Sequence, residues 1–108
     1  LRVSIEALAV RLETSLPGRA RVERSGGGLF GRGERRVREI TVVLSSSSYQ
    51  LAVDGTRMEG ARERRVGGIA IKREPLDPQA WLAALTEELQ EEAQRSASAR
   101  ESLQRLLG

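Results

Sequence analysis

The sequence predicts a small α+β domain in which helices cover one face of an antiparallel sheet. Apolar and polar residues alternate through most of residues 35–74, as in half-buried strands, whereas the flanking segments repeat with the period of a helix. Asp54-Gly55 lies between two alternating runs and favours a two-residue type I′ hairpin turn, with positive φ at both residues. We therefore expect a single domain of 108 residues with a meander of four, or five, antiparallel strands, in the order α-β-β-β-β-α(α).

The first expected element is an amphipathic helix over residues 3–15. Three aliphatic residues recur at the spacing of one helix face: Ile5, Leu8 and Leu12. Pro17 and Gly18 follow, and they end the helix because proline cannot continue it and glycine tolerates the turn. We expect this helix to cover the core and a short strand over residues 19–24 to come next.

A glycine-rich segment, residues 25–34, joins this strand to the following one. Its glycines match G-x-G-x-x-G, but a phosphate-binding loop needs a helix N-terminus after the glycines, and here a strand follows. A hairpin loop is the expected structure. Leu29 and Phe30 form an apolar tip among arginines, so they are candidate contacts for a partner protein or a membrane surface.

The alternating region predicts strands over roughly residues 36–45, 48–53, 56–61 and 69–74. Three apolar sets each share one side of a strand, and we expect them to line the buried face: Ile40, Val42 and Leu44; Tyr49, Leu51 and Val53; Ile69 and Ile71. The opposite face carries mixed charges and small side chains, which is typical of a solvated face. Residues 61–68 fit either a longer fourth strand that ends at a Gly67-Gly68 turn or an exposed basic loop.

Residues 74–95 give the clearest helix signal. Asp77 is a strong N-cap, and Pro78 then occupies the first helical position. Trp81 is expected to be the largest core residue, packed against Leu76 and with its indole N–H bonded to a partner. The expected buried stripe is Leu82, Leu85 and Leu89. The expected exposed face is Glu87, Glu88, Glu91 and Glu92.

The apolar stripe thins after Leu89, and two geometries fit residues 96–108. Ser98 and Glu101 match a capping box, which favours a break and a separate short helix. A continuous helix would instead project as an arm, which a dimer partner or the sheet would have to cover. Three leucines near the C-terminus are therefore candidate interaction residues: Leu103, Leu106 and Leu107.

Basic residues concentrate in the predicted sheet. Residues 19–74 contain 13 basic and seven acidic residues, whereas the rest of the chain contains five and eight. Six arginines are candidate contacts for an anion or a nucleic acid: Arg32, Arg35, Arg36, Arg62, Arg64 and Arg65. Arginine suits planar anions, but the predicted strands offer a single aromatic residue, Tyr49, on which a base could stack.

No pattern nominates a catalytic, metal or cofactor site. The chain has no His and no Cys, so the usual general base and the commonest metal ligand are missing. The serine run 45–48 has no activating base beside it, and no carboxylate pair has a spacing that demands acid–base chemistry. No signal-type run or membrane span is evident, so we expect a cytoplasmic, non-catalytic protein. The sequence begins with Leu1 rather than Met, which leaves open a piece of a longer protein.

The run VGGIAIKREPLDPQAWLAAL (residues 66–85) and the later EEAQRSASARESLQRLL (residues 91–107) resemble small uncharacterised α+β proteins of high-GC Gram-positive bacteria. The resemblance implies a bacterial cytosolic origin and no particular site. The expected element order is also similar to several dimeric chaperone-like and adaptor folds. The leading hypothesis is a protein-interaction or adaptor module that forms a homodimer or binds another protein. The alternative is nucleic-acid binding through the arginine-rich sheet and the 24–36 loop.

Overall fold

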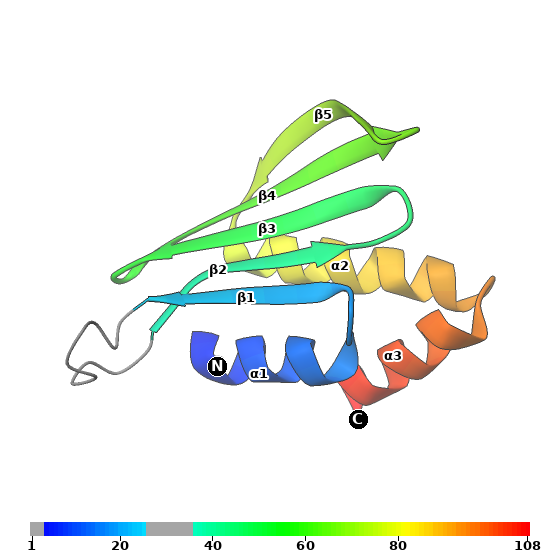
Figure 1. The fold of residues 1–108 in the computed structure, drawn as a ribbon, viewed down its shortest axis with the longest axis horizontal. Helices are drawn as coiled ribbons and strands as arrows, with labels where there is room; N and C mark the ends of the chain where they lie inside the picture. Colours follow the sequence, from blue (N-terminus) through cyan, green and yellow to red (C-terminus); the bar gives the residue numbers. More distant parts are fainter. Residues whose placement is uncertain (1–3, 26–35) are drawn as a thin grey trace.

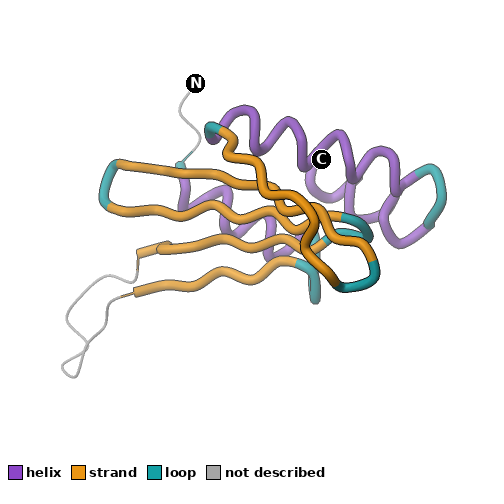
Figure 2. The backbone as a smooth tube through the Cα atoms, turned by 90° about the horizontal axis from the view of Figure 1, so that it is seen from above, coloured by secondary structure: helices purple, strands orange, loops and turns teal. Residues whose placement is uncertain are grey.

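The computed structural model describes residues 4–25 and 36–108. Five antiparallel strands form one open sheet in the order β1-β2-β3-β4-β5. Three helices lie on one side of it: α1 and α2 pack against the sheet, and α3 packs against α1 and α2 (Figures 1 and 2). The elements are α1 Ile5–Ser15, β1 Ala20–Ser25, β2 Arg36–Val43, β3 Ser47–Asp54, β4 Arg57–Val66, β5 Ile69–Leu76, α2 Pro78–Ala93 and α3 Ala97–Leu107. The predicted fold class and element order are confirmed, with five strands and two C-terminal helices.

Each helix begins at a side chain that caps its free N–H groups. Asp77 Oδ1 accepts a hydrogen bond from Ala80 N at 2.8 Å, with Pro78 in the first turn, as predicted. Ser96 Oγ accepts from Ala99 N at 3.3 Å and starts α3. Of the two geometries that fit residues 96–108, the structure has the break and the separate helix, with Ser96 rather than Ser98 as the cap.

Glycines at two hairpin turns set the strand lengths. β4 continues to Val66 and turns at Gly67 and Gly68, whose φ values are 59° and 82°, so residues 61–68 extend the strand. The β3–β4 turn centres on Gly55 and Thr56, and Gly55 alone has a positive φ, 63°. The predicted type I′ turn at Asp54-Gly55 is wrong, because one positive φ at the first central residue is the pattern of a type II′ turn.

The core lies between the sheet and the three helices. Its largest fully buried side chains are Trp81, Tyr49, Leu12, Leu16, Ile40, Leu51, Leu85, Leu89 and Val42. Trp81 meets Tyr49 edge-on, with ring centroids 6.2 Å apart and planes at 83°. Gly60 of β4 leaves the space that Trp81 occupies, because a Cβ at this position would lie 2.9 Å from Trp81 Cδ1 and 2.6 Å from the Leu76 carbonyl oxygen. The N-terminal part of α2 therefore packs closely on β4.

Two expectations about burial are wrong. Ile69 and Ile71 are 69% and 60% exposed rather than buried. Among the described residues the core cluster includes no residue of β5 before Leu76, so this end of the strand does not reach the core. Glu92, expected on the exposed face of α2, is only 4% exposed, because it bonds to groups at the far end of the sheet.

Candidate interaction surface

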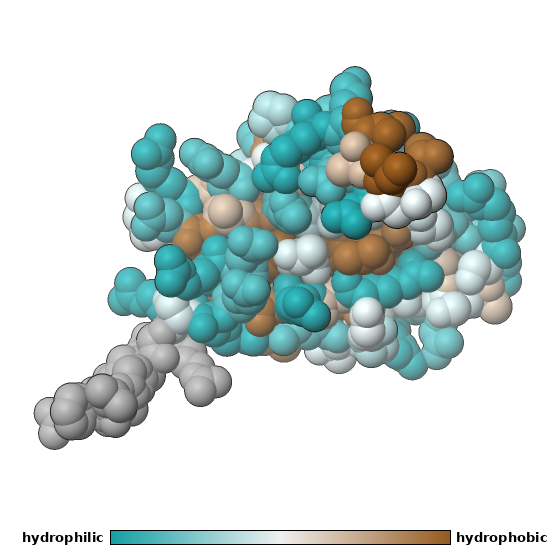
Figure 3. Space-filling model, turned by 45° about the horizontal axis from the view of Figure 1, so that its top comes forward, coloured by the Kyte–Doolittle hydropathy of each residue, from teal (hydrophilic) through white to brown (hydrophobic). Residues whose placement is uncertain are grey.

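The outer edge of β5 carries exposed aliphatic side chains. β5 is the last strand of the sheet, so its outer backbone groups have no neighbouring strand in the described residues. Val66 at the end of β4 and Ile69 and Ile71 of β5, which together we call the β5 edge patch, are 63%, 69% and 60% exposed. Figure 3 shows hydrophobic surface gathered over the β4–β5 hairpin. An exposed apolar edge strand is a template for pairing with another strand.

The other edge of the sheet is charged. β1 exposes Arg21, Glu23 and Arg24. Arg24 Nη2 lies 2.6 Å from Glu13 Oε1 of α1, and its hydrogen bond lowers the pKa of the Glu13 carboxyl. Charged side chains blunt an edge strand against strand addition. The two edges of this sheet therefore differ in chemistry.

Of the five predicted interaction residues, the structure describes the three C-terminal leucines. Leu29 and Phe30 lie outside the described residues. Leu103 packs against the core and Leu106 is buried, so α3 docks on α1 and α2 instead of projecting as an arm. Arg11 Nε donates a hydrogen bond to the Leu106 carbonyl at 2.7 Å, which ties the end of α3 to α1. Of the three leucines, Leu107 stays exposed, at 61%.

Of the six predicted anion-binding arginines, the structure describes four. Arg32 and Arg35 lie outside the described residues, and Arg36 is exposed at the start of β2. Arg62 faces the helices and donates from Nη2 to both carboxylate oxygens of Glu74 at 3.2 Å. This hydrogen bond lowers the pKa of Glu74.

The remaining two arginines also have carboxylates beside them. Arg64 Nε lies 3.9 Å from Glu74 Oε1, and Arg65 Nη2 lies 3.0 Å from Glu63 Oε1. Ion pairs of this kind leave less positive charge available to an anionic partner. These contacts do not favour the nucleic-acid alternative.

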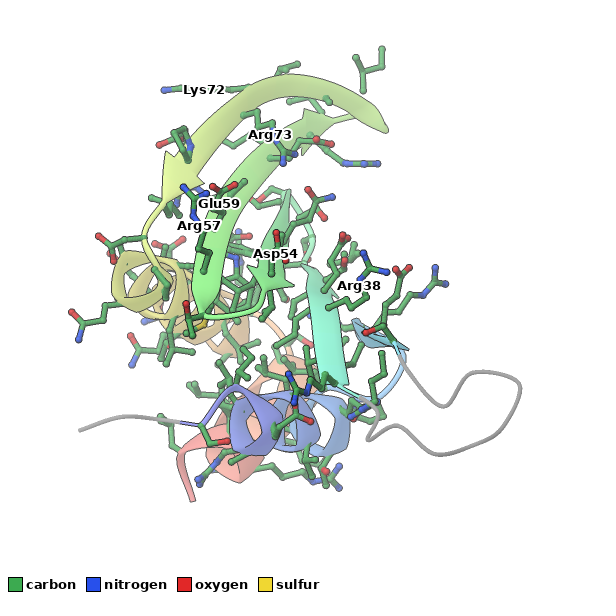
Figure 4. The ribbon with its side chains drawn as sticks, turned by 90° about the vertical axis from the view of Figure 1, so that its left-hand side faces the viewer. Arg38, Asp54, Arg57, Glu59, Lys72 and Arg73 are labelled. Atoms are coloured by element: carbon green, nitrogen blue, oxygen red, sulfur yellow. The ribbon has the colours of Figure 1, made fainter. Side chains whose placement is uncertain are left out.

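Charges of both signs are interspersed on the open face of the sheet. Figure 4 shows Arg38, Asp54, Arg57 and Glu59 on β2, β3 and β4. A shallow hollow of about 660 Å³ lies among them. Within residues 4–25 and 36–108 no acidic side chains are grouped in a way that would hold a metal ion. This face resembles a solvated sheet surface more than a built site.

A polar cluster lies between the sheet and α2. Tyr49 Oη donates a hydrogen bond to Glu88 Oε1 at 2.7 Å and lies 3.2 Å from the Ala84 carbonyl oxygen. Burial, together with Glu88, raises the pKa of Tyr49 to about 12. The buried Arg62 Nε, Glu88 Oε2 and Trp81 Nε1 have no hydrogen-bond partner in the part of the chain that the structure describes. The partner expected for the Trp81 N–H is therefore not found there.

The pKa of Tyr49 can be tested directly, because the chain has one tyrosine. We expect the tyrosinate absorbance to titrate with a midpoint near 12. The folded pKa of Tyr49 is above the ordinary value of 10, so the protonated hydroxyl stabilises the folded chain. This contribution to the free energy of unfolding is complete below pH 10 and is lost as the pH rises through about 12. Glu88→Gln removes the neighbouring charge and should lower the midpoint. A midpoint near 10 while circular dichroism still shows a folded chain would contradict the geometry of the cluster.

The described helices include none that is both long and apolar enough to cross a membrane. Comparisons with family models, curated proteins and solved structures found no match to this chain.

Proposed function

We propose that this protein is a non-catalytic interaction module that self-associates through the free edge of β5. The observation that carries the proposal is the exposure of Ile69 and Ile71, 69% and 60%, on an edge strand. Fully burying one such side chain in an interface contributes about 1.5–3 kcal/mol to the free energy of association, relative to leaving it exposed. Pairing with a second strand would also give hydrogen-bond partners to the outer backbone groups of β5.

The difference between the two sheet edges supports a closed dimer. If β5 of one copy paired with β1 of the next, the head-to-tail contact would produce a ring or an open filament rather than a dimer. Such pairing would desolvate the charged residues Arg21 and Glu23 of β1. Antiparallel pairing of β5 with β5 about a two-fold axis joins the same surface in both copies and stops at two.

Other features of β5 also limit uncontrolled strand addition. Lys72, in the middle of the strand, is exposed. The pairing of β5 with β4 has a bulge at Ile71, which has no partner residue in the register. A lysine and a bulge are both known ways of restricting edge-to-edge association. We therefore expect a modest interface and a dimer that dissociates on dilution.

Replacing Ile71 by lysine is expected to weaken the dimer by at least about tenfold, because each interface would have to bury two ammonium groups. The free energy of unfolding of the monomer should change by no more than about 0.5 kcal/mol, since the side chain is largely exposed. Light scattering coupled to size-exclusion chromatography, over a range of concentrations, measures the dissociation.

Val43→Lys is the matched control. Val43 is 50% exposed, but it lies on β2, an interior strand. This variant should dimerise like the wild-type protein. A wild-type protein that stays monomeric up to roughly 1 mM would overturn the proposal, as would an equal loss of dimer in both variants.

A further inference from the structure

A half-open groove lies on the helical side of the molecule, between α1 and α2. Its volume is about 1330 Å³. Ile5 and Leu8 of α1 form one wall, and Leu82 of α2 forms the other. Leu51 and Met58 contribute from the sheet. None of these residues belongs to the β5 edge patch, so the groove is a separate surface.

The structure shows what kind of segment fits between α1 and α2. Within the described residues no Cα atom of α1 lies within 8 Å of a Cα atom of α2, whereas α3 approaches both helices that closely. α3 places Ala99, Leu103 and Leu106 in or against the core, at a spacing of one helix face. Its two arginines, Arg100 and Arg105, remain exposed. Arg105 Nη2 lies 2.8 Å from Glu101 Oε1 of the same helix, so α3 is an amphipathic helix with one net positive charge. Figure 1 shows it at the end of the molecule where α2 ends.

The α2 wall of the groove adds a preference for positive charge. α2 contains four glutamates and no basic residue. Glu88 and Glu92 bond inward to Tyr49 and Arg19, whereas Glu87 is exposed and lines the groove. A cation on a bound segment would therefore meet Glu87 at the rim of an apolar groove.

We propose that this groove binds an amphipathic, basic helix of a partner protein, seated between α1 and α2 as α3 is. A helix about 10 Å wide that rises 1.5 Å per residue fills roughly 120 Å³ per residue, so the groove accommodates about two to three turns. Its volume also exceeds the ~300–1,000 Å³ typical of a small-molecule pocket. Insertion of an apolar helix face into a hydrophobic groove is a recurrent mode of peptide recognition.

The probe is a fluorescein-labelled synthetic peptide with the alanine and leucine spacing of α3 and arginine on its exposed face. A matched peptide carries glutamate in place of every arginine. Fluorescence anisotropy should show that the basic peptide binds at least about tenfold more tightly than the acidic one. Equal affinity of the two peptides would overturn the proposal, and so would no binding of either up to roughly 1 mM.

Two substitutions on α2 locate the site. Glu87→Lys and Glu91→Lys change the net charge equally and both replace an exposed residue, but Glu87 alone of the two lines the groove. We expect Glu87→Lys to weaken binding of the basic peptide about five- to tenfold and Glu91→Lys to weaken it less than about twofold. An equal effect of both would mean general charge attraction and would contradict a groove site.

A third variant tests whether the peptide occupies the groove itself. Ala83 is exposed and lines the groove, so Ala83→Trp should fill it and abolish peptide binding while the far-ultraviolet circular dichroism stays unchanged. Binding that survives this change would mean that the peptide displaces α3, which overturns the proposal. Palmitate is the second probe. If palmitate binds the wild-type protein but not Ala83→Trp, and the peptide does not bind, the groove is a lipid site and the proposal is overturned.

Discussion

Replacing Trp81 by alanine is expected to lower the free energy of unfolding by about 3–5 kcal/mol. Trp81 is fully buried, and its ring stands edge-on against Tyr49 in the centre of the core. The surroundings cannot collapse easily into the space, because the strand beneath it has no side chain at Gly60. The loss should therefore fall near the upper part of the range for large-to-small core substitutions.

Trp81→Phe is the matched control for this prediction. It keeps an aromatic ring against Tyr49 but removes an indole N–H that has no acceptor among the described residues. We expect a cost of only about 1 kcal/mol, because the lost volume is partly offset by the loss of a buried, unbonded donor. Urea unfolding followed by circular dichroism measures both variants, since the chain has a single tryptophan and its fluorescence is lost. A Trp81→Ala cost below about 1 kcal/mol would contradict the central place of this side chain.

The parts of the fold that could be predicted from the sequence depend on local chemistry. The cap at Asp77, the proline after it and the leucine spacing of α2 all act within a few residues of one another. Gly60 is a further local signal, because an isolated glycine within a strand often marks a close approach of another element. The structure places Trp81 at that point.

Burial at the ends of elements could not be predicted in the same way. The alternation of Ile69 and Ile71 gives the side of the strand on which they lie, but not whether a helix covers that side. Coverage depends on strand order and on where α2 starts, which are properties of the whole sheet. The β5 edge patch was therefore missed as a candidate site. The groove was missed for a related reason, because the distance between α1 and α2 leaves no trace in either sequence.

The chemistry of a residue alone does not show whether it already has a partner within the chain. The C-terminal leucines suggested an unpartnered arm, yet Leu103 and Leu106 contribute to the protein's own core. Arg62 suggested an anion contact, yet strand register sets it opposite Glu74. A residue type shows what a side chain is able to bind, whereas long-range pairing decides whether it is already bound within the chain.

Glu92 is the clearest case of long-range pairing, and it leads to the second large effect. Its Oε2 lies 2.7 Å from Arg19 Nη1, and its Oε1 accepts a hydrogen bond from Ser45 N at 2.6 Å. One carboxylate thus joins the end of α2 to the segment before β1 and to the β2–β3 turn. We expect Glu92→Ala to cost about 2–3 kcal/mol at pH 7, below the usual range for a buried pair because Arg19 is 33% exposed and solvent screens it.

The acid dependence of stability tests the same contact. Burial by itself would raise the pKa of Glu92, but the hydrogen bonds from Ser45 and Arg19 outweigh it and hold the pKa below its ordinary value. A depressed carboxylate pKa stabilises the folded chain above the unfolded pKa of about 4.3, and this contribution is lost as the pH falls through the folded value. The Glu92→Gln side chain is uncharged at every pH, so it has no carboxylate that protonation could neutralise. Its stability deficit relative to the wild-type protein should therefore be largest at neutral pH and shrink in acid.

Glu91→Gln controls for the change of net charge, since Glu91 is exposed one position earlier on α2. Its unfolding free energy should stay within about 0.5 kcal/mol of the wild-type value at every pH at which both fold. Urea unfolding between neutral and acidic pH compares the three proteins. If the deficit of Glu92→Gln were constant with pH, or if Glu91→Gln matched it, the carboxylate of Glu92 would not hold α2 to the sheet through its charge. The expected pH-dependent deficit would instead show that an acidic residue on the apparently solvated face of a helix fastens that helix to the sheet.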